Sequence, residues 1–137
     1  MREILFRGKD RTGILNHSWL VGAMDNINEE SPKIIRPDRY GNSMFIDVAP
    51  ETVGQYTGLT DKNGKKIFEG DICQTKGFPL IDDKPFVVEW NSDECSFYWR
   101  DVLGTDEFNI GVSQNTTIIG NIHDNPELLK GGASDVD

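Results

Sequence analysis

A hairpin signal in the middle of the chain constrains the fold more than any other part of the sequence. Residues 56–73 read YTGLTDKNGKKIFEGDIC, which places an Asn63-Gly64 pair between two apolar runs. Asn-Gly is the preferred pair for a type I′ hairpin turn because both central residues of that turn need positive φ. The segment therefore predicts a turn between two antiparallel β-strands.

The same segment matches neither of the ion-binding loops that it superficially resembles. A phosphate-binding loop has four residues between its glycines and then Lys with Ser or Thr; here five residues separate Gly58 from Gly64, and no hydroxyl residue follows. In a calcium-binding loop that starts at Asp61, the required Gly and Glu would be Lys66 and Ile72. Residues 56–73 are therefore interpreted as a structural turn.

The remainder of the chain favours a mostly β fold built from short antiparallel strands. Helical periodicity is scarce, and short apolar or alternating runs are separated by 14 Gly and 6 Pro residues. One short C-terminal helix is expected from Asn125-Pro126-Glu127, because Asn caps a helix and Pro fits its first turn. The expected strands are residues 4–7, 18–23, 43–48, 53–56, 67–68, 72–75, 86–90, 95–100, 108–112 and 116–122.

Strand spacing suggests how these elements are organised. The strands between Ile67 and Ile122 follow one another closely, which is typical of a small SH3-like barrel. A chain of 137 residues suits one ordinary domain or two very small ones. We expect an N-terminal β region over residues 1–55, a barrel-like region that ends in the short helix over 56–130, and a disordered tail over 131–137.

Charge and hydrophobicity limit the partners of the protein. The chain holds 14 basic and 23 acidic residues, a net charge of −9, which repels nucleic-acid phosphates and anionic lipid. No apolar run approaches the roughly 20 residues of a membrane helix, and the apolar stretch at the N-terminus is too short for a signal peptide. We expect a cytoplasmic protein without membrane association, and the charge does not favour nucleic acid as a partner.

The residues that most often perform chemistry form no recognisable motif. The sequence has two Cys and two His residues, Cys73, Cys95, His17 and His123, with no C-x-x-C pair. We expect two buried thiols on strands, since Cys often behaves as a small hydrophobe. No catalytic residue, metal or cofactor is expected. An enzyme that uses Cys73 or Cys95 as a nucleophile remains an alternative, and it would require a reactive thiol.

The central turn carries a basic cluster that is a candidate interaction site. Lys62, Lys65 and Lys66 lie around its tip, with aromatic residues nearby in the sequence. Such a cluster can contact single-stranded nucleic acid. Exposed lysines also serve solubility and protect sheet edges against aggregation.

The density of aromatic residues around position 98 indicates a second candidate surface. Phe97, Tyr98 and Trp99 are adjacent, and neighbouring residues of a strand point to opposite faces. If Phe97 and Trp99 fill the core, Tyr98 faces outward. An excess of exposed aromatic surface favours a binding partner or self-association.

Four segments, taken in order, resemble a known family. They are MREILFRGKD, the central YTGLTDKNGKKIFEGDIC, FVVEWN and the closing IIGNIHDNPELL. Together they are similar to the YopX-like proteins of bacteriophages and prophages, over essentially the whole chain, although Gly8-Lys9 departs from the family's more frequent opening. The resemblance implies a small, mostly β, phage-encoded protein in the cytoplasm of a bacterial host. It supplies neither an established activity nor catalytic residues.

The resemblance and the residues together lead to one functional expectation and one alternative. We expect a non-enzymatic phage or prophage accessory protein that works by protein–protein contact, as a homo-oligomer or with an unknown host or phage protein. The alternative is a nucleic-acid-associated module that uses Lys62, Lys65 and Lys66.

Overall fold

A computed structural model describes residues 3–25, 30–76, 84–101, 107–109 and 115–130. The chain divides into two compact units, Met1–Tyr56 and Thr57–Asp137. Strands in the described residues form antiparallel sheets, and the only helices there are two short 3-10 helices.

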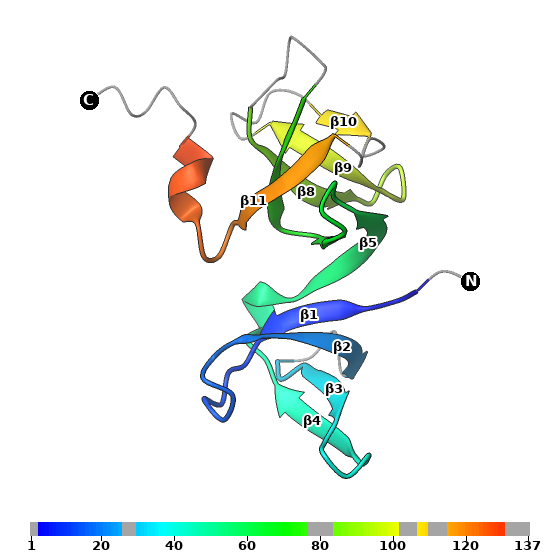
Figure 1. Cartoon of the computed structure of the whole chain (residues 1–137), viewed down its shortest axis with the longest axis vertical. Helices are drawn as coiled ribbons and strands as arrows, with labels where there is room; N and C mark the ends of the chain where they lie inside the picture. The colour runs from blue at the N-terminus through cyan, green and yellow to red at the C-terminus, as the bar shows by residue number, and fades with distance from the viewer. Residues whose placement is uncertain (1–2, 26–29, 77–83, 102–106, 110–114, 131–137) are drawn as a thin grey trace. The chain divides into compact units, whose positions relative to one another are not determined.

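The first unit is an antiparallel sheet in which four strands follow in chain order, β4-β3-β2-β1, with the start of β5 next to β1. Figure 1 shows β1 to β4 as neighbouring arrows coloured blue to cyan. The 3-10 helix η1 leads from β4 into β5. The elements are β1 (Phe6–Lys9), β2 (Trp19–Asp25), β3 (Lys33–Pro37), β4 (Ser43–Asp47), η1 (Pro50–Thr52) and β5 (Gly54–Thr60).

One face of this sheet forms the core of the first unit. Leu20, Ile34, Ile46 and Val48 are buried, and half-buried apolar side chains such as Met44 pack against them. Met44, Ile46 and Val48 share this face, as their alternation in the sequence predicts.

The second unit continues from the later part of β5, which pairs with β6, and contains a five-stranded sheet in the order β10-β9-β8-β7-β11. A bulge between Ile118 and Gly120 shifts the register of β11 against β7. The further elements are β6 (Lys66–Phe68), β7 (Asp71–Thr75), β8 (Phe86–Asn91), β9 (Ser96–Asp101), β10 (Glu107–Asn109), β11 (Thr116–Asn121) and the 3-10 helix η2 (Pro126–Lys130).

An aromatic pair lies at the centre of the core of the second unit. The rings of Phe86 and Trp99 stack at 5.8 Å between centroids. Ile67, Cys73 and Val88 complete the buried cluster. Alternation along β8 and β9 places Phe86, Val88 and Trp99 on this face. Val87 on the opposite face of β8 is also buried, and it pairs with the buried Ile72 of β7.

The predicted fold class is confirmed at the level of a mostly β protein with short antiparallel strands. An SH3-like closure of the barrel stays a prediction, since the strand pairing forms open sheets. At the predicted C-terminal helix the chain forms the five-residue 3-10 helix η2. The predicted tail over 131–137 lies outside the described residues.

Two local predictions need correction. The strand β3 was not expected, because the polar run before Lys33 and the turn at 38–42 leave only a few apolar residues between them. Cys95 was expected to be a buried strand residue, but it is exposed in the turn before β9 with a φ of 51°. Cys95 belongs to the turn between β8 and β9 and not to a strand. Cys73 is the buried thiol of the two.

Candidate functional site

The predicted basic cluster lies on a turn that is organised by a buried carboxylate. Asp61 is 5% exposed, and its Oδ1 accepts hydrogen bonds from the backbone N–H groups of Asn63 and Lys65, each at 2.9 Å. Its Oδ2 accepts a third, from the N–H of Ile118 on β11, at 3.2 Å. The backbone N–H of Lys62 also donates to the carbonyl of Thr116. One side chain therefore shapes the turn and fastens it to β11.

This geometry shows that the prediction of a type I′ turn is wrong. Gly64 has a φ of 82°, but Asn63 is not among the residues with positive φ, and a type I′ turn needs both. The N–H of Gly64 donates instead to the carbonyl of Asp61 at 3.0 Å. The hydrogen bonds from the backbone to the Asp61 side chain explain the difference, because an Asp at the start of a turn can fix its conformation in this way.

The protonation of Asp61 follows from these contacts. Burial opposes ionisation, but the backbone N–H groups of Lys65, Ile118 and Asn63 and the charge of Lys65 together hold the pKa of the Asp61 carboxyl below its usual value. The carboxylate is therefore an acceptor committed to the backbone.

The structure brings the three predicted lysines together on this turn. Lys62, Lys65 and Lys66 are all exposed. Because Asp61 fixes the backbone beneath them, the positive charges are displayed on an ordered tip. The arrangement is compatible with contact to an anionic partner, and it gives no ligand set for a bound ion.

Tyr98 lies on a different element, the strand β9, where it is half-buried. It faces Glu89 across the β8–β9 pair, and Glu89 accepts a hydrogen bond from Arg100 Nη2 at 2.6 Å. Tyr98 thus points away from the core face that holds Trp99, as alternation along the strand requires. A polar, partly charged patch surrounds it.

The first unit carries a surface that sequence reasoning did not identify. We call it the outer face, and it is the side of the β1–β4 sheet opposite the core. Cross-strand pairing aligns its members, with Arg7 opposite Val21, Lys9 opposite Trp19, and Ile35 between Ala23 and Phe45. Val21 is 42% exposed and Phe45 is 54% exposed. The outer face consists of Arg7, Lys9, Trp19, Val21, Ala23, Ile35 and Phe45.

Two cations border the apolar residues of the outer face on the β1 side. The guanidinium carbon of Arg7 lies 4.6 Å from the centroid of the Trp19 ring, and the Lys9 ammonium nitrogen lies 5.5 Å from it. Both distances fall within the range of cation–π attraction. These contacts hold two positive charges beside an aromatic ring on an exposed sheet.

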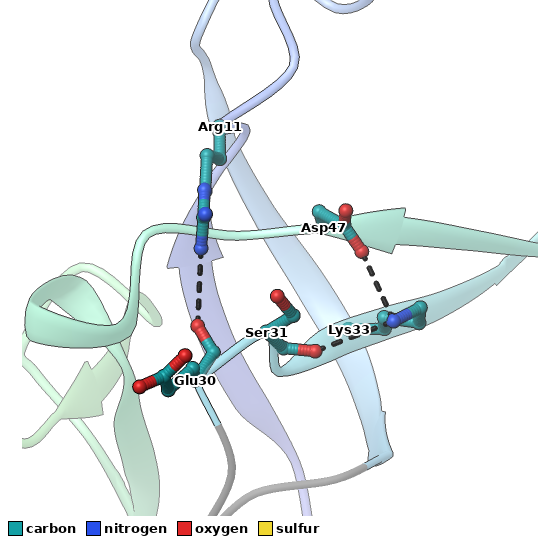
Figure 2. A network of polar contacts seen from close by, with 5 residues as sticks. All are labelled: Arg11, Glu30, Ser31, Lys33 and Asp47. Carbon is teal, nitrogen blue, oxygen red and sulfur yellow. Dashed lines mark hydrogen bonds and ion pairs between the residues drawn. The ribbon is translucent and has the colours of Figure 1, made fainter.

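Near the Lys33 end of β3 the outer side of the sheet carries two carboxylates, because Asp25 of β2 and Asp47 of β4 both lie opposite Lys33. Figure 2 shows Lys33 Nζ beside Asp47 Oδ1, at 3.2 Å, and close to the carbonyl oxygen of Ser31. In the same view Arg11 Nη1 donates to the backbone carbonyl of Glu30 at 3.0 Å. Lys33 is thus flanked by two carboxylates, whereas Arg7 and Lys9 lie at the β1 border of the outer face beside Trp19.

A signal for this surface was present in the sequence of β2. In Trp19–Asp25, WLVGAMD, apolar residues occupy both alternating sets, Leu20 and Met24 on one side and Trp19 and Val21 on the other. A strand with one solvated face should alternate with polar residues. Two apolar sets therefore indicate either a strand that is buried on both faces or a strand with one exposed apolar face. The strand pairing and the exposure of Val21 show that β2 is of the second kind.

A second buried carboxylate, Asp10, organises the loop that connects β1 and β2. Its oxygens accept hydrogen bonds from the Thr12 hydroxyl at 2.5 Å and from the backbone N–H groups of Leu15 at 2.7 Å and Thr12 at 2.9 Å. Led by the Thr12 hydroxyl, these bonds lower the pKa of Asp10 to about 2 in spite of its burial. The side chain acts as a structural anchor and leaves little capacity for a ligand.

The predicted chemical residues do not assemble into a centre within the described parts of the chain. Among those residues, no group of three or more His, Cys, Asp and Glu side chains is arranged to hold a metal ion. Nor do the described segments include a helix with the length and apolar character that crossing a membrane requires. The outer face and the lysine tip, which comprises Lys62, Lys65 and Lys66, remain as the candidate sites.

Comparisons with known proteins place the chain in a family. A search of curated proteins finds no significant match. Among solved structures, the chain is similar to the crystal structure of protein EF1440 from Enterococcus faecalis, with 25% identity and a TM-score of 0.54, covering 94% of this chain and 99% of that one. The family model described as YopX protein matches residues 6–130. The chain belongs to the YopX family.

Proposed function

We propose that the protein works by binding other protein chains, itself included, and that it performs no catalysis. The observation that carries the proposal is the outer face of the first unit, where Val21 and Phe45 are largely exposed on a regular sheet beside Trp19. Contiguous exposed apolar residues flanked by charge are typical of protein interaction sites. Aromatic residues and Arg are the side chains that contribute most often to binding energy.

The use of the buried acidic residues supports a non-enzymatic role. Catalytic carboxylates need oxygens that can reach a substrate. Here Asp10 accepts hydrogen bonds within its own loop, and Asp61 accepts them from its own turn and from Ile118 of β11. Asp71 Oδ2 accepts the N–H of Phe68 at 2.8 Å. These three side chains therefore act in shaping turns.

We also propose that the protein is a phage or prophage accessory protein that works in the cytoplasm of a bacterial host. The support is the resemblance of the sequence to YopX-like proteins of phages and prophages, together with membership of the YopX family. Expression during phage growth or lysogeny, followed by fractionation of the host cell, tests this part. Recovery with the membrane fraction would contradict it.

Photocrosslinking from the outer face tests the interaction itself. A benzoylphenylalanine at position 45 replaces an aromatic residue that is already exposed, so the change is small. The same probe at position 14 is the control, because Ile14 is 75% exposed but lies in the β1–β2 loop. We expect discrete crosslinked protein bands in host cells from position 45 and none from position 14. Equal labelling from both positions would mean that the outer face is not a binding site.

A second candidate function is supported by the lysine tip. The Asp61 turn displays Lys62, Lys65 and Lys66 on an ordered backbone, which suits contact with the phosphates of a single strand. Three such contacts would give log K a slope of about −2 against log salt concentration. The triple alanine variant should then lose the binding of a fluorescent single-stranded oligonucleotide, and Lys76→Ala/Lys84→Ala should not. The absence of binding at low salt would rule this function out.

A further inference from the structure

We propose that the outer face binds the β8–β9 hairpin of a second copy of the chain, so that copies associate head to tail. This inference rests on the proposed function in protein binding and adds the partner and the contact. The partner surface, which we call the acidic hairpin, comprises residues 90–97 at the end of β8 and the start of β9 in the second unit.

The acidic hairpin combines one exposed aromatic ring with two carboxylates. Trp90 is 46% exposed and lies edge-on against Phe97, with ring centroids 5.0 Å apart and planes at 69°. Asp93 and Glu94 are exposed in the turn. Their backbone N–H groups donate to Asn91 Oδ1 at 3.0 and 3.1 Å. The turn is therefore ordered and presents its side chains without a further folding step.

The outer face has the complementary features. Val21, Ile35 and Phe45 offer an apolar strip that suits the Trp90 ring. Arg7 and Lys9, held beside Trp19, lie at one border of that strip. A projecting hairpin can place its aromatic side chain on the strip and its carboxylates beside the two cations. Opposite charges then fix the orientation of the contact and accelerate the encounter.

The distribution of charge along the chain points to a second copy as the partner. Residues 1–56 hold 7 Lys and Arg against 8 Asp and Glu, whereas residues 57–137 hold 7 against 15. Nearly all of the net negative charge therefore belongs to the second unit. Two first units would bring Arg7 and Lys9 of one copy toward those of the other. The first unit is nearly neutral, and in a contact with the second unit of another copy its Arg7 and Lys9 would instead meet carboxylates.

The contact joins two different surfaces of one chain, so it is heterologous. A complex of two copies leaves one outer face and one acidic hairpin unused, so further copies can add unless a ring closes. The contact is built from a few side chains on each copy, namely Val21, Ile35, Phe45, Arg7 and Lys9 on one and Trp90, Asp93 and Glu94 on the other. We expect association in the micromolar range that weakens as added salt screens the charges.

Sedimentation of the full-length protein with two surface variants tests the contact. The face variant is Lys9→Glu/Phe45→Ser, and the hairpin variant is Asp93→Lys/Glu94→Lys. Each should associate at least about tenfold more weakly than the wild type, because each loses its charge pairs. The matched controls are Lys84→Glu/Ile14→Ser and Asp124→Lys/Glu127→Lys, which change charge and exposed apolar surface away from both proposed contact surfaces. Both controls should associate as the wild type does.

Mixing the two variants gives the decisive measurement. The face variant keeps an intact hairpin and the hairpin variant keeps an intact outer face. At a concentration where the wild type associates, each variant alone should be mostly monomeric, and an equal mixture should form a one-to-one complex that does not grow further. Recovery of binding in the mixture also shows that both variants are folded. A mixture that stays monomeric, or a hairpin variant that self-associates as strongly as the wild type, would overturn the proposal.

Carbodiimide crosslinking of the unmodified protein provides a readout that no variant can disturb. A mixture of ¹⁵N-labelled and unlabelled chains should yield peptides of mixed label that join Lys9 to Asp93 or Glu94. A wild-type protein that is strictly monomeric up to about 200 µM, far above a micromolar dissociation constant, would exclude the second copy. Crosslinks from position 45 to a host protein or to nucleic acid alone would also exclude it. The host-protein result would leave the proposed function standing.

Discussion

Replacing Asp61 by Asn is the sharpest test of how the second unit is held together. The substitution keeps the size of the side chain and removes its charge. One carbonyl oxygen can still accept the N–H groups of Asn63 and Lys65, whose bonds to Oδ1 measure 2.9 Å each. The new NH₂ group then faces the N–H of Ile118, which donates to Oδ2 in the native turn. This side-chain NH₂ and the backbone N–H of Ile118 are both donors, so the hydrogen bond from Ile118 is lost.

The cost follows from these three bonds. Losing the bond from Ile118 to a charged acceptor costs about 1.5–3 kcal/mol, and the two remaining bonds weaken because their acceptor becomes neutral. Asp61 is 5% exposed, so water compensates little. We expect the free energy of unfolding to fall by about 2–4 kcal/mol, which moves the urea midpoint by roughly 1–2 M.

Urea unfolding followed by Trp fluorescence measures this change. In a Trp19→Phe background the signal comes from Trp90 and Trp99, which both belong to the second unit. Lys62→Ala is the control, because its exposed side chain can be removed while its backbone bond to Thr116 remains. That control should change stability by less than about 0.5 kcal/mol. If Asp61→Asn also costs less than that, and the Ile118 amide exchanges no faster, Asp61 does not anchor the turn.

Three further predictions follow from individual residues. The pKa of Asp10 falls from 3.8 to about 2 in the folded protein, so its stabilising contribution is complete above pH 4 and disappears as the pH falls from 4 to 2; Asp10→Asn should make the loss of thermal stability over that range shallower, and an unchanged profile would contradict the role of the loop. In Gly22→Ala the new Cβ would lie 2.5 Å from the backbone oxygen of Ile35, which should lower the free energy of unfolding by about 1–3 kcal/mol. In Gly41→Ala the Cβ meets no atom and only the φ of +84° is unfavourable, so the loss should be about 1 kcal/mol. Calorimetry that reversed this order would refute the close packing of β2 against β3 at Gly22. Because Cys95 is exposed and Cys73 is buried, a thiol reagent should modify Cys95 in the native protein and Cys73 only as it unfolds; mass spectrometry of the modified peptides identifies which cysteine reacts first.

Local sequence was sufficient to predict the β class and most strands. Alternation placed Met44, Ile46 and Val48 on one face, and it placed Phe86 and Val88 on another, because side chains of a strand alternate between its two faces. The Asn63-Gly64 pair located the central hairpin, since few residues tolerate the positive φ that Gly64 adopts. Each of these patterns spans only a few residues, and it specifies the conformation of those same residues.

Local sequence failed where a distant residue decides the conformation. The turn type at 61–65 depends on Asp61, which also binds Ile118 across 57 positions of the chain. The strand β3 forms because Ile34 pairs with both Met24 and Ile46, and its own short apolar run was too weak a signal.

The sequence by itself determined that this protein is a set of short antiparallel strands with an ordered turn at residues 61–65. Only the tertiary structure decided which apolar residues remain exposed. In β2 both alternating sets are apolar, and pairing with β1 and β3 aligned Leu20 and Met24 with the core and left Trp19 and Val21 on the outer face. Alternation defines two faces of a strand, but burial of one of them depends on partners that lie far away in the chain.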